Sequence, residues 1–224
     1  MAFSVLPVIL TCETDLSLTR TFVTGFRNVQ HVLQAPIVLI DQSKAPKLSG
    51  EYLSVVASTS PAAVYVHPRE SGMSTYDSVQ EAANLALELA LGHAADGDYI
   101  LFLEDDIAFS SRFADRVVNT YLGPETGFLT LYAPGNEYGF HVVEPSRFYG
   151  TQCLLFPRRA VEEIVSNTQY MMANFMPGYD IRWSRFLAHK GYVLYATDFS
   201  YVQHLPRNSR LHGGGTHMSH RFVP

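Results

Sequence analysis

The chain has 224 residues, of which 47% are hydrophobic and 17% charged, and its formal net charge is -5 at pH 7. This composition is typical of one globular domain, and the net negative charge does not indicate nucleic-acid binding, although a local basic groove is compatible with it. Two cysteines, Cys12 and Cys153, are too few for a disulfide framework, so free thiols are expected. The absence of a positively charged leader and of a membrane-length apolar run predicts a cytoplasmic protein without a transmembrane segment.

The first half of the chain alternates predicted strands with predicted helices. Apolar runs typical of strands cover residues 5–15, 35–46, 63–68 and 99–109. Apolar residues at helical spacing cover 16–33 and 74–94, and Asp15 or Ser17 is placed to cap the first of these helices. Strands alternating with helices on this scale predict a parallel α/β sheet with helices on both faces.

The second half is less regular. Its helical patterns cover residues 111–122, 158–175 and 179–191. Its strand-like runs cover residues 126–134, 148–157 and 192–205. Residues 207–224 are rich in Gly, Ser, Arg and His and are predicted to form a loop. The whole pattern predicts a single α/β domain with a mixed, mostly parallel central sheet.

Polar residues end three of the predicted strands. Right-handed crossovers place the carboxyl ends of parallel strands on one edge of the sheet, and ligands of open α/β sheets bind at that edge. We therefore expect Thr11, Asp41 and the acids at 104–106 to line one crevice, although they lie far apart in the sequence.

Three consecutive acids, Glu104, Asp105 and Asp106, directly follow the buried run at 99–103. A solvated turn or helix cap is one interpretation. A pair of carboxylates for general acid and base catalysis is another, but neighbouring residues on a strand point to opposite faces. We favour a third, in which a divalent cation such as Mg²⁺ or Mn²⁺ binds one acid and a substrate diphosphate, while another acid reaches a ribose hydroxyl.

The succession of "VILTCETD", "IVLIDQS" and "NLALELALGHAADGDYILFLEDDI" resembles the nucleotide half of GT-A glycosyltransferases, particularly the inverting family-two group, over residues 5–110. The resemblance implies the GT-A, Rossmann-like fold, with a donor-binding half at 1–110, an acceptor and catalytic half at 111–206, and a flexible loop or lid at 207–224. It also implies that Asp106 coordinates the metal and that Glu104 or Asp105 contacts the ribose or the donor sugar. Family two has Asp-x-Asp at this place, whereas other GT-A groups have Glu-Asp-Asp.

The resemblance also suggests where the donor nucleotide binds. In the family, residues after the first two strands bind uridine, and Thr11, Glu13 and Asp41 occupy these places. Asp41 could instead stabilise a turn. Arg69, in "HPRESG", could contact the base or the diphosphate, or could be an ordinary surface arginine.

The segment "MPGYDIRWSRFLAHKGYVLYATDFSYVQHL" resembles the part of the family that carries the catalytic base at its final acid, which implies that role for Asp180. An inverting transfer requires a carboxylate to take the acceptor proton. Asp180 could also cap its own helix, and the two roles can coexist. Tyr179 stands where the family has Glu, and Trp183 is expected to pack behind this helix.

Histidines and arginines near the C-terminus complete the list of candidates. Several metal-dependent GT-A enzymes place a histidine ligand at the position of His204, and His212 is a second candidate for the metal. Arg210 and His212 lie among glycines, in a segment that could close over the diphosphate as a lid. That segment could also be a disordered terminus or an expression remnant.

The predicted function is a metal-dependent, hexosyltransferase-type glycosyltransferase that uses Mn²⁺ or Mg²⁺ and a UDP-sugar donor, with inversion at the sugar. A sugar nucleotidyltransferase is an alternative, but "LTCETDLSLTR" lacks the glycine of a phosphate-binding loop. An inactive GT-A-like binding module is another: Tyr179 favours it, whereas Asp106, Asp180 and His204 disfavour it. The acceptor could be a glycan, a lipid-linked sugar, a protein or a hydroxymethylated DNA base. Aromatic residues between 121 and 149 could stack against a sugar or a base, or could instead cover an edge of the core.

Overall fold

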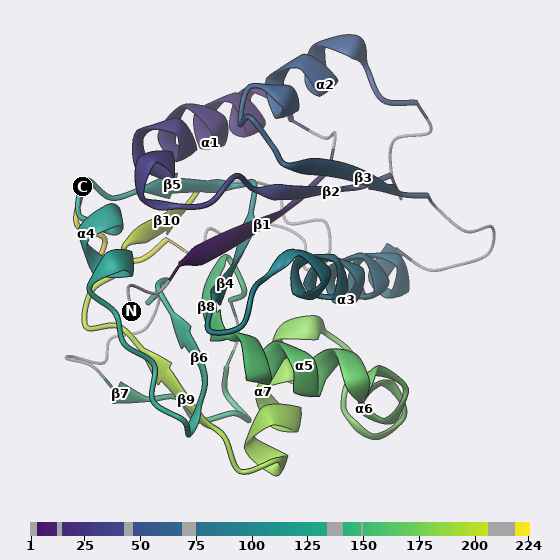
Figure 1. Ribbon diagram of the computed structural model, residues 1–224, viewed down its shortest axis with the longest axis vertical. Helices are drawn as coiled ribbons and strands as arrows, with labels where there is room; N and C mark the ends of the chain where they lie inside the picture. The colour runs from purple at the N-terminus through teal and green to yellow at the C-terminus, as the bar shows by residue number, and fades with distance from the viewer. Residues whose placement is uncertain are drawn as a thin grey trace.

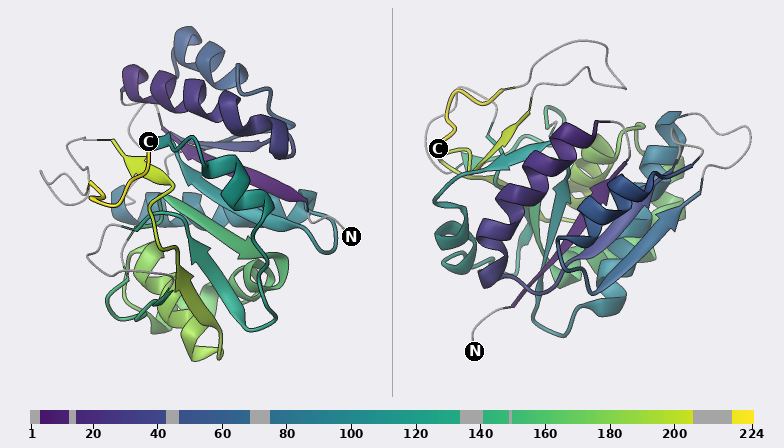
Figure 2. Two further views of the ribbon diagram at one scale, coloured as in Figure 1. Left: turned by 90° about the vertical axis from the view of Figure 1, so that its left-hand side faces the viewer. Right: turned by 90° about the horizontal axis from the view of Figure 1, so that it is seen from above.

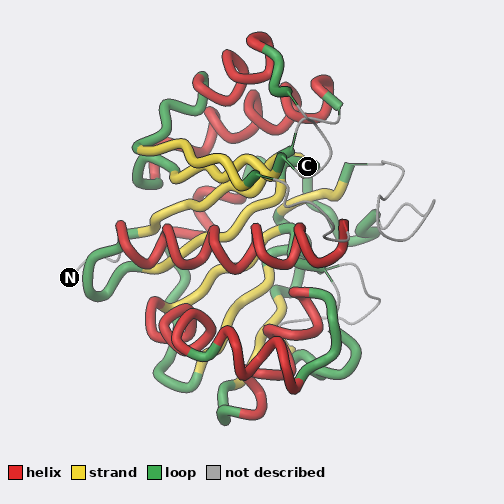
Figure 3. The backbone as a smooth tube through the Cα atoms, turned by 90° about the vertical axis from the view of Figure 1, so that its right-hand side faces the viewer, coloured by secondary structure: helices red, strands yellow, loops and turns green. Residues whose placement is uncertain are grey.

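The computed structural model describes residues 4–12, 15–42, 47–68, 75–133, 141–148, 150–205 and 218–224. Within these ranges one central sheet is covered by helices on both faces (Figure 1). Helices α1 and α2 lie on one face, and α3, α5 and α7 lie on the other (Figure 3). None of the helices in the described ranges is long and apolar enough to cross a bilayer.

The central sheet has eight strands, in the order β3 (Ala63–His67), β2 (Ile37–Asp41), β1 (Val5–Thr11), β4 (Tyr99–Glu104), β8 (Cys153–Pro157), β6 (Thr126–Thr130), β9 (Val193–Ala196) and β7 (His141–Val142). The first four pair in parallel, as β6 and β9 also do. Strand β8 runs antiparallel to both its neighbours, and β7 runs antiparallel to β9. The predicted fold class, an α/β domain with a mixed and mostly parallel sheet, is therefore confirmed.

The α-helices of the described chain are α1 (Leu16–Val29), α2 (Gly50–Ala57), α3 (Thr75–His93), α4 (Phe113–Val118), α5 (Arg158–Ser166), α6 (Thr168–Asn174) and α7 (Tyr179–His189), and a short 3₁₀ helix, Gln30–Val32, follows α1. The predicted cap of α1 is confirmed, because Asp15 Oδ1 accepts hydrogen bonds from the amides of Ser17 and Leu18. Helix α2 was not expected from the sequence. It begins after Ser49, whose hydroxyl accepts from the amide of Tyr52.

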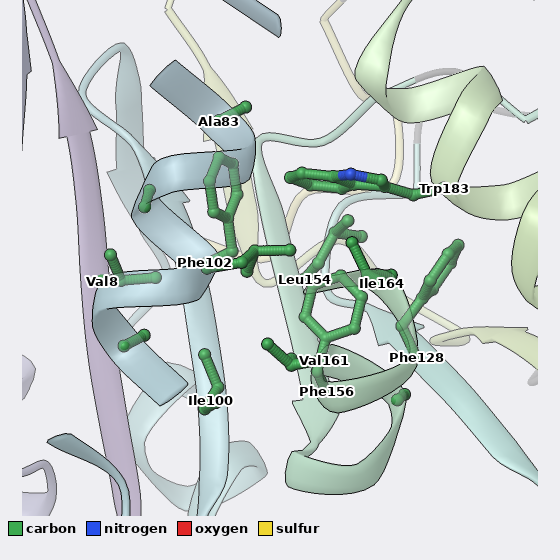
Figure 4. Packing of buried hydrophobic residues seen from close by; sticks show 14 of the residues in the cluster. Val8, Ala83, Ile100, Phe102, Phe128, Leu154, Phe156, Val161, Ile164 and Trp183 are labelled. Carbon is green, nitrogen blue, oxygen red and sulfur yellow. The ribbon is translucent and has the colours of Figure 1, made fainter. Parts of the chain in front are cut away.

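Apolar side chains fill the space on both faces of the sheet. Figure 4 shows the cluster beneath α3 and α5, in which Trp183 lies beside Leu154 and Ile164. The Trp183 ring meets Phe102 edge-on, with centroids 5.3 Å apart, and is fully buried. This confirms the expected packing role of Trp183 and fixes α7 against the sheet.

Three predicted elements are divided in the structure. The strand-like run at 99–109 forms β4, which ends at Glu104, and a short second strand at 107–109. The run at 192–205 was expected to be one strand, but β9 ends at Ala196 and a separate strand, β10 (Val202–His204), follows. Strand β10 pairs antiparallel with β5 (Ile107–Phe109) outside the central sheet. The helical pattern at 158–175 likewise breaks at Asn167, between α5 and α6.

The aromatic segment suggested for the acceptor is mostly a core element where it is described. Tyr132 and Phe148 are buried, so their rings are not available to stack against a substrate. The suggested stacking role is therefore wrong for these two side chains, which apolar packing explains instead.

The end of the chain returns to the fold. Ser219 donates its hydroxyl to the carbonyl of Ala133, and its amide donates to Gln203 Oε1 at 2.8 Å. The Ser111 hydroxyl donates to the carbonyl of Pro224 at 2.7 Å. Figure 2 shows this last segment beside β10. Part of the predicted loop at 207–224 is thus packed on the domain, while residues 206–217, including Arg210 and His212, lie outside the described residues.

Candidate functional site

The expected convergence of strand ends is present. In the parallel part of the sheet, Leu10 pairs with Glu104, and Thr11 pairs with Ile40. Thr11, Asp41 and Glu104 therefore lie at the same edge of the sheet. The shared register of the parallel strands, rather than proximity in the sequence, brings these polar groups together.

Two of the candidate metal ligands, Asp106 and His204, lie next to each other in the structure. Strand β10 pairs with β5 so that His204 lies opposite Ile107, and the amide of Leu205 donates to the Asp106 carbonyl at 2.7 Å. This pairing brings His204 Nε2 to 3.2 Å from Asp106 Oδ2. Both side chains are largely buried, with exposed fractions of 11% and 14%. The antiparallel ribbon thus positions the two residues that were proposed to bind a metal.

The chemistry of this pair fits a divalent cation. Asp106 Oδ1 is buried and accepts no hydrogen bond from any residue in the described ranges. A buried carboxylate oxygen without a donor is rare in folded proteins, and a bound cation would satisfy it. No group of three or more His, Cys, Asp or Glu side chains gathers around a metal position in the described part of the chain. Mg²⁺ and Mn²⁺ would take their remaining ligands from phosphates and water.

Glu104 is held by two hydroxyl groups from the other half of the chain. Thr151 donates to Glu104 Oε1 at 2.5 Å, and the Tyr179 hydroxyl donates to the same oxygen at 2.6 Å. Burial, and then the charge of Asp106, raises the pKa of Glu104 to about 7, although these two hydrogen bonds act in the opposite direction. Glu104 therefore exchanges a proton near neutral pH.

Asp180 lies at the start of α7, close to Glu104. Its Oδ1 accepts from the amide of Ile181 at 2.8 Å, and its Oδ2 accepts from the amide of Gly150 at 3.4 Å. The neighbouring Tyr179 connects α7 to Glu104. Asp180 thus reaches the same edge of the sheet as the three acids, in a half-buried position that leaves carboxylate lone pairs for a further partner.

The three consecutive acids have different environments. Asp105 Oδ2 accepts hydrogen bonds from the hydroxyls of Thr11 at 2.6 Å and Thr19 at 3.0 Å. Asp105 is only 6% exposed, so it fastens the end of β4 to the start of α1. Glu104 contacts α7, and Asp106 contacts β10. The triplet that the sequence presents as one motif is therefore distributed over three parts of the fold.

His67 is a residue of this edge that the sequence analysis missed. It ends β3 opposite Asp41, and its Nδ1 lies 3.6 Å from Asp41 Oδ1. Its Nε2 lies 3.9 Å from Glu81 Oε2 on α3. Like Asp41, His67 is a polar residue at the end of a predicted strand, and this position could have identified it as a candidate from the sequence. Of the other proposed site residues, Glu13 and Arg69 lie outside the described residues, as Arg210 and His212 do.

Changing Tyr179 to Phe tests the bond that holds α7 to Glu104. The variant keeps the ring that packs against Phe102 and Trp183 but removes the hydroxyl donor. We expect a loss of about 1–2 kcal/mol in the free energy of unfolding, measured by urea denaturation. Tyr170→Phe, which changes a half-exposed phenol, is the matched control. If both variants and the wild type have the same free energy of unfolding, the hydrogen bond from Tyr179 to Glu104 does not stabilise the folded state.

Comparison with known proteins defines the fold. No protein-family model matches the chain, and no curated protein matches it. Among solved structures it is similar to PcManGT, a mannosyltransferase from Pyrobaculum calidifontis in complex with GDP-Man and Mn²⁺, with a TM-score of 0.53 and 14% sequence identity. The match covers 86% of this chain and 56% of that chain, so this chain spans just over half the length of that enzyme. The likeness shows that this chain has an α/β, Rossmann-like fold similar to the fold of that enzyme.

Proposed function

We propose that this protein is a metal-dependent glycosyltransferase that moves a sugar from a nucleoside-diphosphate donor to an acceptor hydroxyl. The observation that carries the proposal is the Asp106–His204 pair, in which one carboxylate oxygen of Asp106 is buried and has no donor among the described residues. The similarity of the fold to a mannosyltransferase that binds GDP-Man and Mn²⁺ supports it.

The cation would be held by Asp106 and His204, with His212 as a further candidate ligand outside the described residues. When bound, it supplies positive charge that stabilises the departing diphosphate. The β5–β10 pairing holds these two side chains close together, which supports their proposed role as a pair of metal ligands. Arg69 and Arg210 are proposed to contact the diphosphate or the base.

The other donor contacts follow from the sheet edge. Glu104 Oε1 accepts both hydroxyl donors, so Oε2 is the oxygen that we assign to a hydroxyl of the ribose or the donor sugar. Asp105 is a weaker candidate, because its carboxylate already binds Thr11 and Thr19. Thr11, Glu13 and Asp41 are proposed to bind the nucleoside. The resemblance of the sequence favours uridine, whereas the similar structure was solved with GDP-Man, so both nucleotides need testing.

Asp180 is the proposed general base of an inverting transfer. In this step the acceptor oxygen bonds to the anomeric carbon, the bond from that carbon to the diphosphate oxygen breaks, and Asp180 takes the acceptor proton. Tyr179 and Gly150 hold the residue near the donor site, through their contacts with Glu104 and with Asp180 itself.

Calorimetric titration tests the donor site. We expect UDP or GDP to bind in the presence of Mn²⁺, and binding to weaken at least tenfold, or about 1.4 kcal/mol, with chelator or in Asp106→Ala. His204→Ala should also weaken it, because it removes the other proposed ligand. Asp115→Ala, at an exposed acid in α4, is the control and should bind like the wild type.

Two results would change the proposal. If neither nucleotide binds under any condition, the metal and nucleotide assignment is wrong, and the acids form a structural turn. If a nucleotide binds with Mn²⁺ but no nucleotide-sugar is ever hydrolysed or transferred, the protein is a binding module, as the Tyr179 substitution in the family pattern would then indicate.

A further inference from the structure

A groove whose lining includes neither Asp106 nor His204 lies between α3 and the turn that joins α5 to α6. Its volume is about 700 Å³, within the range of roughly 300–1,000 Å³ that is usual for ligand sites. One wall consists of Glu81, Asn84, Leu85 and Glu88, which lie at helical spacing on one face of α3. The other wall consists of residues 165–170 together with Met172. The break between α5 and α6 at Asn167 is what turns this second wall toward α3.

The lining excludes several classes of ligand. It contains no Lys, Arg or His among the described residues, so phosphates and nucleotides find no cation there. Glu81 and Glu88 are two helical turns apart, about 10 Å along the axis of α3, so they cannot both coordinate one metal ion. Besides these two carboxylates, the polar side chains of the lining are mainly neutral hydroxyls and amides: Asn84, Ser166, Asn167, Thr168 and Gln169.

Asn84 provides a hydrogen-bond donor of fixed direction at the floor of the groove. Its Oδ1 accepts from Trp183 Nε1 at 2.9 Å, which fixes the orientation of the amide. Its Nδ2 has only the sulfur of Met172 as a described partner, at 3.9 Å. That sulfur already accepts from Arg182 Nη1 at 2.9 Å. Asn84 is 9% exposed, so a nearly buried N–H donor lacks a good acceptor, and the oxygen of a ligand hydroxyl would supply one.

Aromatic and apolar surface completes the site. Tyr170 lines the groove and is 46% exposed, and its ring lies near those of Phe175, Phe186 and His189. Leu85 and Val165 add apolar surface. Neutral hydrogen-bonding groups around an exposed aromatic ring suit a ligand that has hydroxyl groups on its edges and C–H groups on its faces.

We propose that this groove binds an uncharged carbohydrate chain, at a site separate from the Asp106–His204 pair. In a glycosyltransferase such a chain would be part of the acceptor, but the binding itself does not depend on the catalytic assignment. The carboxylates and amides would bind vicinal hydroxyls, and Tyr170 would contact a sugar face.

The test uses the full-length protein on a printed array of neutral, sulfated and sialylated oligosaccharides. We expect at least one neutral oligosaccharide to bind the wild type, and its affinity to fall at least tenfold in Ser166→Tyr, which fills the groove, and in Glu88→Ala, which removes an exposed carboxylate. Ser54→Tyr makes the same change at an exposed serine of α2, on the opposite face of the sheet, and should bind like the wild type.

Fluorescence then locates the bound oligosaccharide. Trp183 is the only tryptophan of the chain, and its Nε1 is bonded to the groove residue Asn84, so occupancy should change its emission. The proposal is overturned if no neutral oligosaccharide binds, if only charged ones bind, or if Ser166→Tyr and Ser54→Tyr bind equally. Calorimetry with UDP, GDP and Mn²⁺ should give the same affinities for Ser166→Tyr as for the wild type. A wrong groove proposal can therefore be distinguished from a wrong donor-site proposal.

Discussion

Replacing Asp180 with Asn is expected to slow sugar transfer by roughly 100- to 10,000-fold while donor binding stays unchanged. The asparagine side chain has the same size as aspartate, and its carbonyl oxygen can still accept the hydrogen bond from the backbone amide of Ile181. It cannot, however, take a proton from the hydroxyl group of the sugar acceptor. The measurement is the rate of nucleoside-diphosphate release from the donor sugar identified by titration, at saturating donor, in wild type and variant.

Asp198→Asn is the matched control for this experiment. Asp198 also accepts a hydrogen bond from the amide of the residue that follows it, Phe199, so the substitution removes a comparable charge from a comparable contact. It should keep the wild-type rate. If Asp180→Asn instead destabilises the fold but transfers sugar at the normal rate per folded molecule, Asp180 is only a helix cap and the base must be sought elsewhere.

Asp105→Ala is expected to lower the free energy of unfolding by about 3 kcal/mol or more. Hydrogen bonds to a charged group contribute roughly 1.5–3 kcal/mol each, and the substitution removes two of them, from Thr11 and Thr19, inside a buried site. It also leaves two buried hydroxyls without this acceptor. Urea denaturation measures the loss, and Asp115→Ala, at an exposed acid, should change stability by less than about 0.5 kcal/mol.

A double-mutant cycle assigns the Asp105 effect to its contacts. The effects of Asp105→Ala and Thr19→Val should be non-additive, because each removes the same hydrogen bond. Additive effects, or a stable Asp105→Ala variant that no longer binds nucleotide, would mean that Asp105 contacts the donor, as the resemblance of the sequence allows. Asp105 and Asp106, adjacent in the sequence, would then share the donor site.

The sequence by itself determined the fold class and the convergence of three strand ends at one edge of the sheet. Continuous apolar runs and helical spacing identified β1, β2, β3, β4, α1, α3 and α7, because these periodicities are local properties of strands and helices. The crossover rule then placed Thr11, Asp41 and Glu104 at one edge, as the parallel register shows. Asp106, His204 and Asp180 were candidates through resemblance, and their metal-binding and catalytic roles remain predictions.

The tertiary structure alone decided which of these groups meet. His204 lies 98 residues after Asp106 in the sequence. The two meet because the chain leaves the central sheet after β9 and β10 then pairs with β5, a pairing that no local pattern encodes. The separation of the three acids among α1, α7 and β10, and the break at Asn167 that forms the groove, have the same origin. Such contacts depend on how the whole chain packs its apolar surface, whereas the spacing of residues along the chain records only the local geometry of each element.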